Sequence, residues 1–315
     1  MFTAFWRNSV IALAAILSLV STPHNVADAT VISQTKTDIA QVNLNTAPDV
    51  SLDDRIKSWI DTLSKQPGWE NWKNAKWTSN PLGPGMHGWI VELSDNSQAI
   101  GYLVVLATED GDYILSEYGK GGSPLFNKQT LAEALVNQGM VNEDIGNVVV
   151  QIDEVHPIDP NANIYVQRFY RNALEAFWRV EMEDRIAYLD ANTGEKLPLD
   201  QLPNLEMNSV TQAPYKLSGS PNTLMLPAFD PYEQLTWVTA EPLPIKQLAD
   251  LQTALKANPR LTYVSNLYED AHHVPVAVLG YAKWQDNNGT YLIIEQNGER
   301  YIPLSTALLL GFFYS

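Results

Sequence analysis

The chain contains no cysteine. Disulfide bonds, zinc sites built from thiolates, a lipid-modified N-terminal cysteine and a cysteine nucleophile are therefore all excluded. Basic residues are also scarce: 20 Lys and Arg stand against 36 Asp and Glu, and the net charge is −16. Nucleic-acid backbones are bound by clustered Lys and Arg, and the sequence contains no such cluster. We therefore expect no nucleic-acid partner.

Motifs that would specify a reaction are missing as well. The sequence has no Gly-x-Ser-x-Gly elbow, and the glycines of Gly119–Gly122 lack the spacing of a phosphate-binding loop. Residues 190–201 lack the ligand spacing of a calcium-binding EF-hand. His272 and His273 are the only adjacent histidines, and neighbours on a strand point to opposite faces, so they are poorly placed to share a metal ion. We expect no metal and no cofactor, and the sequence specifies no reaction.

Long hydrophobic runs are absent too. The run Val10–Val20 has eleven residues, about half of what a membrane-spanning helix needs. It follows the base Arg7 and precedes Ala27-Asp28-Ala29, which has the small-x-small pattern of a cleavage site. Residues 1–29 are therefore predicted to be a signal peptide cleaved after Ala29, which leaves no membrane span in a protein that is secreted or held in the cell envelope. An uncleaved anchor is the alternative interpretation.

The pattern of apolar, polar and proline-rich segments predicts an α+β fold with antiparallel sheets, a few short helices and two domains. Residues 30–50 are polar and without apolar period, which predicts a flexible leader. Residues 51–200 are predicted to form an α+β domain with two β-meanders. Residues 201–231 carry several prolines and are predicted to be a linker. Residues 232–315 are predicted to form a second, small α+β domain.

The first domain is organised around residues 85–126, which predict three strands, Trp89–Leu93, Ile100–Ala107 and Tyr113–Tyr118. The last two are joined by a turn at Asp110-Gly111, a strong hairpin signal. The middle strand is almost wholly apolar, which predicts that both its faces are covered. A helix capped by Ser51 precedes these strands.

Further elements follow. A short helix begins near Asn127 or Thr130. The second meander comprises strands at 147–152, Ile164–Tyr170, Ala176–Met182 and Arg185–Asp190. In the second domain a strand is predicted at Leu235–Thr239 and a helix at Ile245–Ala257, and they are followed by strands at Leu261–Ser265, Val274–Trp284, Tyr291–Gln296 and Glu299–Pro303.

Two segments resemble prosegment and inhibitor modules of secreted bacterial peptidases. Gly101–Val105 followed by Tyr113–Gly119 is similar to the propeptide strands of streptopain-type proteases. Phe177–Glu181 with Ala187–Leu197 is similar to the end of a PepSY module, where a strand closes on an Asp-Ala-x-Thr-Gly turn. These resemblances imply a module that contacts a peptidase.

A third resemblance lies near the C-terminus. His273–Tyr281 and Tyr291–Glu295 look like the histidine-bearing strands of papain-like, C39-type peptidases. The resemblance implies that His272 or His273 occupies the general-base position. That chemistry needs a neighbouring thiolate, and the chain has none, so a true relative would be a pseudoenzyme.

Aromatic residues supply candidate binding positions. Closely spaced tryptophans could stack on sugars or peptides, or cover one end of a core. The candidate binding residues are Trp69, Trp72, Trp77, His87 and Trp89.

The leading hypothesis is an exported, non-enzymatic protein that binds a protein or peptide, with a secreted peptidase as one candidate partner. One alternative is a hydrolase or degenerate papain-like domain that uses His272 or His273. The other is a cell-envelope structural or carbohydrate-binding protein.

Overall fold

The computed structural model describes residues 50–141, 150–152, 164–182, 185–203, 217, 219–285 and 289–315. All of these belong to one compact unit, Ala47–Ser315. The predicted signal peptide 1–29, the predicted leader up to residue 49 and residues 204–216 and 218 of the predicted linker lie outside the described residues.

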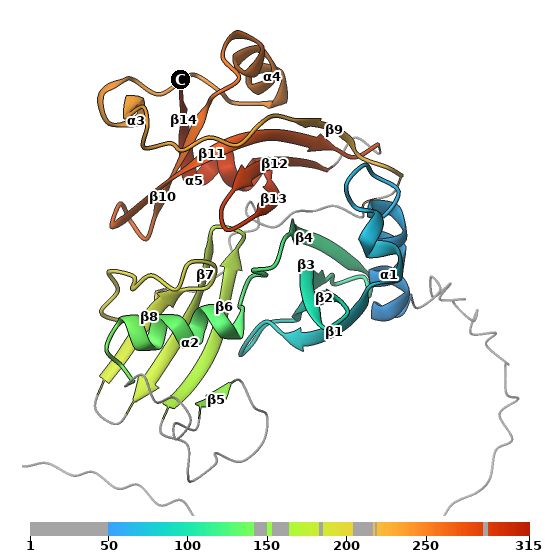
Figure 1. Ribbon diagram of the computed structural model, residues 1–315, viewed down its shortest axis with the longest axis vertical. Helices are drawn as coiled ribbons and strands as arrows, with labels where there is room; N and C mark the ends of the chain where they lie inside the picture. Colours follow the sequence, from blue (N-terminus) through green and yellow to red (C-terminus); the bar gives the residue numbers. More distant parts are fainter. Residues whose placement is uncertain are drawn as a thin grey trace, which may run out of the picture. The chain divides into compact units, whose positions relative to one another are not determined.

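The fold is α+β, as the sequence predicted, and is built on two sheets (Figure 1). The larger sheet of the described residues has ten strands in the order β1-β2-β3-β4-β13-β12-β11-β10-β14, with β9 paired to β11. All of its strand pairs are antiparallel. Its strands are β1 (Lys76–Pro81), β2 (Gly88–Asp95), β3 (Gln98–Ala107), β4 (Tyr113–Lys120), β9 (Asn222–Met225), β10 (Thr262–Leu267), β11 (His272–Lys283), β12 (Thr290–Glu295), β13 (Glu299–Pro303) and β14 (Gly311–Tyr314).

The smaller sheet has the order β5-β6-β7-β8, and its one parallel pair is β5 with β6. Its strands are β5 (Val150–Ile152), β6 (Ile164–Asn172), β7 (Glu175–Met182) and β8 (Arg185–Asp190). The helices are α1 (Leu52–Leu63), the 3-10 helix η1 (Glu70–Asn74), α2 (Lys128–Asn137), α3 (Thr236–Thr239), α4 (Leu248–Ala257) and α5 (Leu304–Leu310).

Helices α1 and α2 begin where their capping residues predict. The Ser51 side chain accepts a hydrogen bond from the Asp54 backbone N–H at 3.1 Å, and Asn127 caps α2 in the same way. The apolar stripe of α1 is buried and includes Ile56, Trp59 and Ile60. Each helix therefore covers part of a sheet with the face that its sequence pattern indicates.

The strand β3 is covered on both faces, as its apolar composition predicted. Leu103 and Val105 belong to a cluster that includes the buried face of α1. Tyr102 and Val104 belong to a second cluster, which contains α2 and the smaller sheet. The ten-stranded sheet thus separates two cores at β3, because successive strand residues point to opposite faces.

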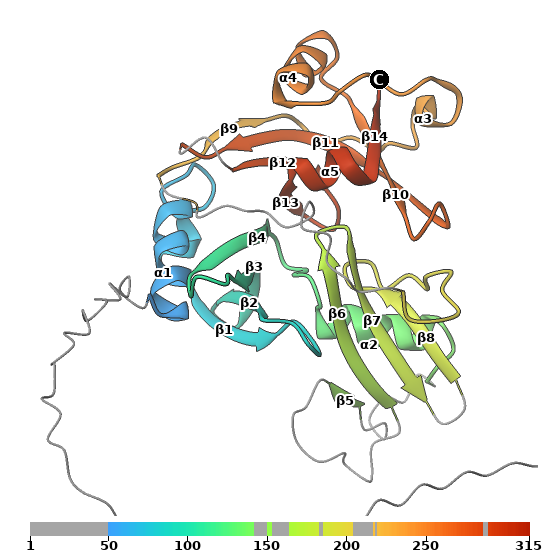
Figure 2. The ribbon, with the colours of Figure 1, turned by 180° about the vertical axis from the view of Figure 1, so that it is seen from behind.

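The larger sheet continues from the first predicted domain into the second. Strand β4 pairs with β13 through the partners Lys120 and Glu299, Gly119 and Arg300, and Tyr118 and Tyr301. Figure 2 shows β4 and β13 from behind. Backbone hydrogen bonds therefore join the predicted regions 51–200 and 232–315 directly.

Several local predictions differ from the structure. The predicted strand Leu235–Thr239 is wrong: Thr236–Thr239 form the single helical turn α3, closed by a hydrogen bond from the Ala240 N–H to the Thr236 carbonyl. The β-branched and aromatic composition of this segment favours a strand, but none of the described strands pairs with it. The predicted linker contains strand β9, and β1 and β14 were not predicted.

Candidate interaction surface

The tryptophans predicted to bind a ligand lie in or against the core. Trp69 and Trp72 are 5 % and 0 % exposed, and their rings meet edge to face at 4.7 Å. Trp77 and Trp89 are half-buried against the same cluster. These four side chains close one end of the core beside α1, and they do not form an exposed row of rings.

The predicted histidines lie at the surface. His87 and His273 are exposed and His272 is half-buried. The last two are consecutive at the start of β11, where His272 pairs with Leu267 and His273 with Asn266 of β10. Within the part of the chain that the structure describes, none of the three imidazoles forms a hydrogen bond or an ion pair with an acid or a hydroxyl. The described residues also hold no group of three or more His, Cys, Asp and Glu that could bind a metal ion.

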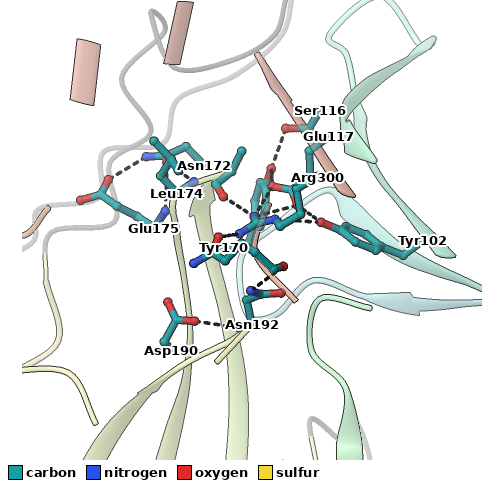
Figure 3. A network of polar contacts seen from close by, with 12 residues as sticks. Tyr102, Ser116, Glu117, Tyr170, Asn172, Leu174, Glu175, Asp190, Asn192 and Arg300 are labelled. Carbon is teal, nitrogen blue, oxygen red and sulfur yellow. Dashed lines mark hydrogen bonds and ion pairs between the residues drawn. The ribbon is translucent and has the colours of Figure 1, made fainter. Parts of the chain in front are cut away.

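Sequence reasoning missed a buried polar network centred on Glu117 of β4 and Arg300 of β13 (Figure 3). Their ion pair has an Nη2–Oε1 distance of 3.1 Å, and the two side chains are 0 % and 5 % exposed. The Tyr102 hydroxyl donates to Glu117 Oε1 at 2.6 Å and accepts from Arg300 Nε at 3.1 Å. The signal in the sequence is a charged residue, Glu117, within an otherwise apolar strand.

The same network reaches the smaller sheet. The Tyr170 hydroxyl of β6 lies 2.8 Å from Ser116 Oγ and donates to Glu117 Oε2 at 3.3 Å. Arg300 Nη2 donates to the carbonyl of Ala173, in the turn after β6, at 2.5 Å. These bonds fix the position of the β6–β7 turn relative to β4 and β13.

The chemistry of this network suits structure better than catalysis. Burial raises the pKa of Tyr102 and of Tyr170 well above the ordinary tyrosine value, so both hydroxyls stay protonated. Burial alone would lower the pKa of Arg300. The neighbouring Tyr102 and Glu117 raise that pKa by more than burial lowers it, so the guanidinium stays charged. The adjacent cavity, lined in part by Asp190, Asn192 and Arg300, has a volume of about 10 Å³. It has room for one water molecule and for no substrate.

A surface feature with different properties lies around α3, in residues 227–240, which we call the 227–240 loop. Three large apolar side chains project from it: Tyr232, Leu235 and Val238 are 59 %, 51 % and 60 % exposed. Figures 1 and 2 both place α3 beside β14, near the C-terminal end of the chain. Large apolar side chains exposed together on one short segment are typical of a protein-binding surface.

Contacts within the loop and with Arg260 support its conformation. Tyr232 and Trp237 meet edge to face at 5.8 Å, and Trp237 Nε1 donates to the Pro231 carbonyl at 3.3 Å. Arg260 donates to Glu233 at 2.5 Å and lies over the Phe229 ring at 4.9 Å. Leu235 and Val238 take no part in these contacts and are 51 % and 60 % exposed.

A hollow of about 360 Å³ lies at the base of the loop. Its lining residues are Pro227, Ala228, Phe229, Glu233, Pro259 and Arg260.

Comparison of the chain with protein-family models, with curated proteins and with solved structures found no match. The resemblances to propeptide, PepSY and C39-type strands therefore stay predictions. None of the described helices is both long and apolar enough to span a membrane.

Proposed function

We propose that this chain is an exported, non-enzymatic protein that binds another protein through the 227–240 loop, in the manner of a peptidase inhibitor or prosegment. The observation that carries the proposal is the exposure of Tyr232, Leu235 and Val238 on a braced loop. Full burial of a fully exposed side chain of this kind gains roughly 1.5–3 kcal/mol, and these three are 51–60 % exposed, so a partner that covers all three gains roughly half of that from each. A loop already held in shape loses little conformational entropy on binding.

The charge around the loop indicates the kind of partner. Residues 227–240 contain the acids Asp230 and Glu233 and no base, and Glu241 follows directly. Arg260, which contacts the loop, is already paired with Glu233. The whole chain carries a net charge of −16. We therefore expect the partner to present an apolar cleft with basic residues at its rim.

The alternative functions have less support. A hydrolase would need an imidazole bonded to an acid or hydroxyl in a cleft, and among the described residues His87, His272 and His273 form no hydrogen bond or ion pair with either. A carbohydrate site on the tryptophans would need accessible ring faces, and Trp69 and Trp72 are buried.

Two variants of the loop test the proposal. The double variant Leu235→Asp/Val238→Asp replaces apolar surface with charge, and we expect it to lose complex formation with peptidases secreted by the same organism, followed by size-exclusion chromatography. The control Gln234→Asp adds a negative charge at an exposed neighbouring position and removes no apolar side chain, so it should bind like the unaltered chain. Binding that survives the double variant, or no complex with any of these peptidases, would refute the proposal.

Export has its own test. Mass spectrometry of the protein recovered from the culture medium or the cell envelope should give an N-terminus directly after Ala29. A protein that retains residues 1–29 would support the uncleaved-anchor alternative.

A further inference from the structure

A pocket of about 410 Å³ is lined by strand β9, by the junction of β4 with β13 and by the turn after α1, and we call it the β9 pocket. None of its lining residues belongs to the 227–240 loop. Its volume falls within the range of roughly 300–1,000 Å³ that is usual for small-molecule sites. The pocket is therefore large enough to hold a small ligand.

Two opposite charges lie side by side on one wall of the pocket. Lys120 of β4 and Glu299 of β13 are directly opposed partners in the larger sheet. Lys120 Nζ lies 3.7 Å from Glu299 Oε1, which is longer than a hydrogen bond, and the side chains are 29 % and 28 % exposed. Among the described residues, no group accepts a hydrogen bond from Lys120 Nζ, and none donates one to Glu299 Oε1. Both atoms therefore keep hydrogen-bonding capacity for a ligand.

Aromatic side chains hold these two charges in place. The Tyr301 hydroxyl donates to Glu299 Oε2 at 3.3 Å, and this bond leaves Oε1 available. Burial raises the pKa of Tyr301, so the hydroxyl remains a donor. Lys120 Nζ lies over the Trp69 ring, 5.8 Å from its centroid. The wall thus presents an ammonium group and a carboxylate oxygen at fixed positions.

A second carboxylate lies near the same ammonium group. Hydrogen bonds from the backbone N–H groups of Glu70 and Gly68, together with the Lys120 charge, lower the pKa of Glu70. Two acids, Glu70 and Glu299, therefore surround one base at this wall. A ligand that carries a carboxylate alone would be repelled, so a ligand needs a cationic group as well.

The opposite side of the pocket is less polar. Pro67, Pro221 and Met225 line it, and Met225 is 42 % exposed. Thr223 and Met225 both line the pocket from β9, because alternate residues of a strand point to the same face. An apolar group of a ligand would be covered on this side.

We propose that the β9 pocket binds a small zwitterion, an α-amino acid with an apolar side chain. Its ammonium group pairs with Glu299 Oε1, and its carboxylate accepts hydrogen bonds from Lys120 Nζ. Its side chain lies against Pro67, Pro221 and Met225. The two charges of an α-amino acid are held close together, as are the two charges on the wall. A ligand with a single charge would leave one wall charge without a partner.

Variants of the two charged residues test the site. Lys120→Met and Glu299→Gln each remove one charge, and the control Lys57→Met removes an exposed lysine that lines no part of the pocket. The probes are L-leucine, L-methionine and L-phenylalanine, titrated by calorimetry. We expect at least one to bind the unaltered chain and the control equally, and to bind each pocket variant about tenfold more weakly or less. No binding of any probe at about 10 mM, or equal affinity for all variants, overturns the proposal.

Analogues of the bound amino acid test the need for both charges. For phenylalanine these are 3-phenylpropionate, which lacks the ammonium group, and 2-phenylethylamine, which lacks the carboxylate. Each should bind the unaltered chain about tenfold more weakly than the amino acid or less. An analogue that binds as tightly as the amino acid overturns the zwitterion.

Two further measurements locate the ligand without changing a charge. Thr223→Trp fills the pocket and should abolish binding, and retained affinity contradicts the site even if Lys120→Met fails to fold. In methyl NMR of the labelled protein, the ligand should shift the Met225 resonance and leave that of Met182, buried in the smaller sheet, in place. A bound ligand that leaves Met225 unshifted lies elsewhere and overturns the proposal.

Discussion

At the scale of single residues, Glu117 and Arg300 have the largest expected effect on stability. They come from β4 and β13, which lie side by side in the larger sheet, and both are almost fully buried. Neutralising one member of such a pair leaves the other charge buried without compensation. Their role is therefore tested by replacing one member alone.

We expect Glu117→Gln to lower the free energy of unfolding by about 3 kcal/mol or more. The control is Asp61→Asn, which removes a surface ion pair to Lys57 whose side chains are 48 % and 62 % exposed. Surface pairs contribute about 1 kcal/mol or less, so the control should unfold close to the unaltered chain. Urea denaturation compares the two, and equal midpoints would show that the network does not stabilise the fold.

The buried tyrosines predict a loss of stability in alkali. Burial raises the pKa of Tyr102, Tyr170, Tyr263 and Tyr268 above the ordinary value, which is about 10 in the unfolded chain. Above about pH 10 the unfolded chain releases protons that the folded chain retains, so stability present below that pH is lost as the pH rises. Each such residue contributes a slope of up to about 1.4 kcal/mol per pH unit.

Tyrosinate absorbance and far-ultraviolet circular dichroism, followed together from neutral to high pH, check this prediction. The last tyrosines should ionise only as the helices and strands unfold. Complete ionisation near pH 10 with the fold intact would mean that these hydroxyls are accessible to solvent.

At the scale of elements, Gly280 of β11 is a position that only glycine fits. Its φ is +135°, and a Cβ there would lie 2.0 Å from the Leu224 carbonyl oxygen of β9. Gly280→Ala should therefore displace β9 and lower stability by about 2 kcal/mol or more. The matched control is Gly111→Ala, where φ is +80° and no atom lies within 4 Å of the added Cβ. The control should lose only about 1 kcal/mol of stability, from backbone strain alone. Equal losses would mean that β9 does not pack as the structure has it.

Local signals in the sequence predicted most of these elements. Gly111 has the positive φ that the Asp-Gly turn predicted, and Asn297 and Gly298, in the turn between β12 and β13, also have positive φ. Strand β1 was not predicted because its sequence, KWTSNP, is polar, ends in proline and has no apolar alternation. Strands β9 and β14 are four residues each, too short to show a period.

At the scale of the whole molecule, the ten-stranded sheet joins segments far apart in the sequence. Alternate residues of β12 contribute to two cores, with Tyr291 and Ile293 in one and Leu292 and Ile294 in the other. Pairing of β4 with β13 links these cores to the N-terminal strands. The structure thus predicts that the described residues of the two predicted domains share much of their stability.

We expect the mature protein to unfold in urea as one cooperative transition, with intrinsic fluorescence and circular dichroism coincident. Intrinsic fluorescence reports on buried tryptophans in both regions, such as Trp72 near α1 and Trp284 near the C-terminus, whereas circular dichroism reports on the strands and helices as a whole. Two separated transitions would show that the regions 51–200 and 232–315 unfold independently.

The candidate binding surface was harder to predict than the fold. Composition and spacing do not distinguish a tryptophan in the core, such as Trp72, from one that stacks on a ligand. Leu235 and Val238 lie in a segment whose composition favours a buried strand. Their exposure follows from the folding of the whole loop, in which Arg260 lies over Phe229 and Trp237 bonds to the Pro231 carbonyl, and these contacts form only in the folded chain. Two features used in the proposed function came from the sequence alone. The acidity of the chain indicates a partner with basic residues, and the lack of a thiol excludes a cysteine nucleophile.

The most direct measurement of the central proposal is a titration of secreted peptidases from the same organism with the mature protein. Substrate hydrolysis is followed as the protein is added to a fixed amount of each peptidase. The account predicts that at least one peptidase loses activity with one-to-one stoichiometry, and that Leu235→Asp/Val238→Asp leaves that peptidase fully active. Undiminished hydrolysis by every peptidase at a large excess of the protein would contradict the account.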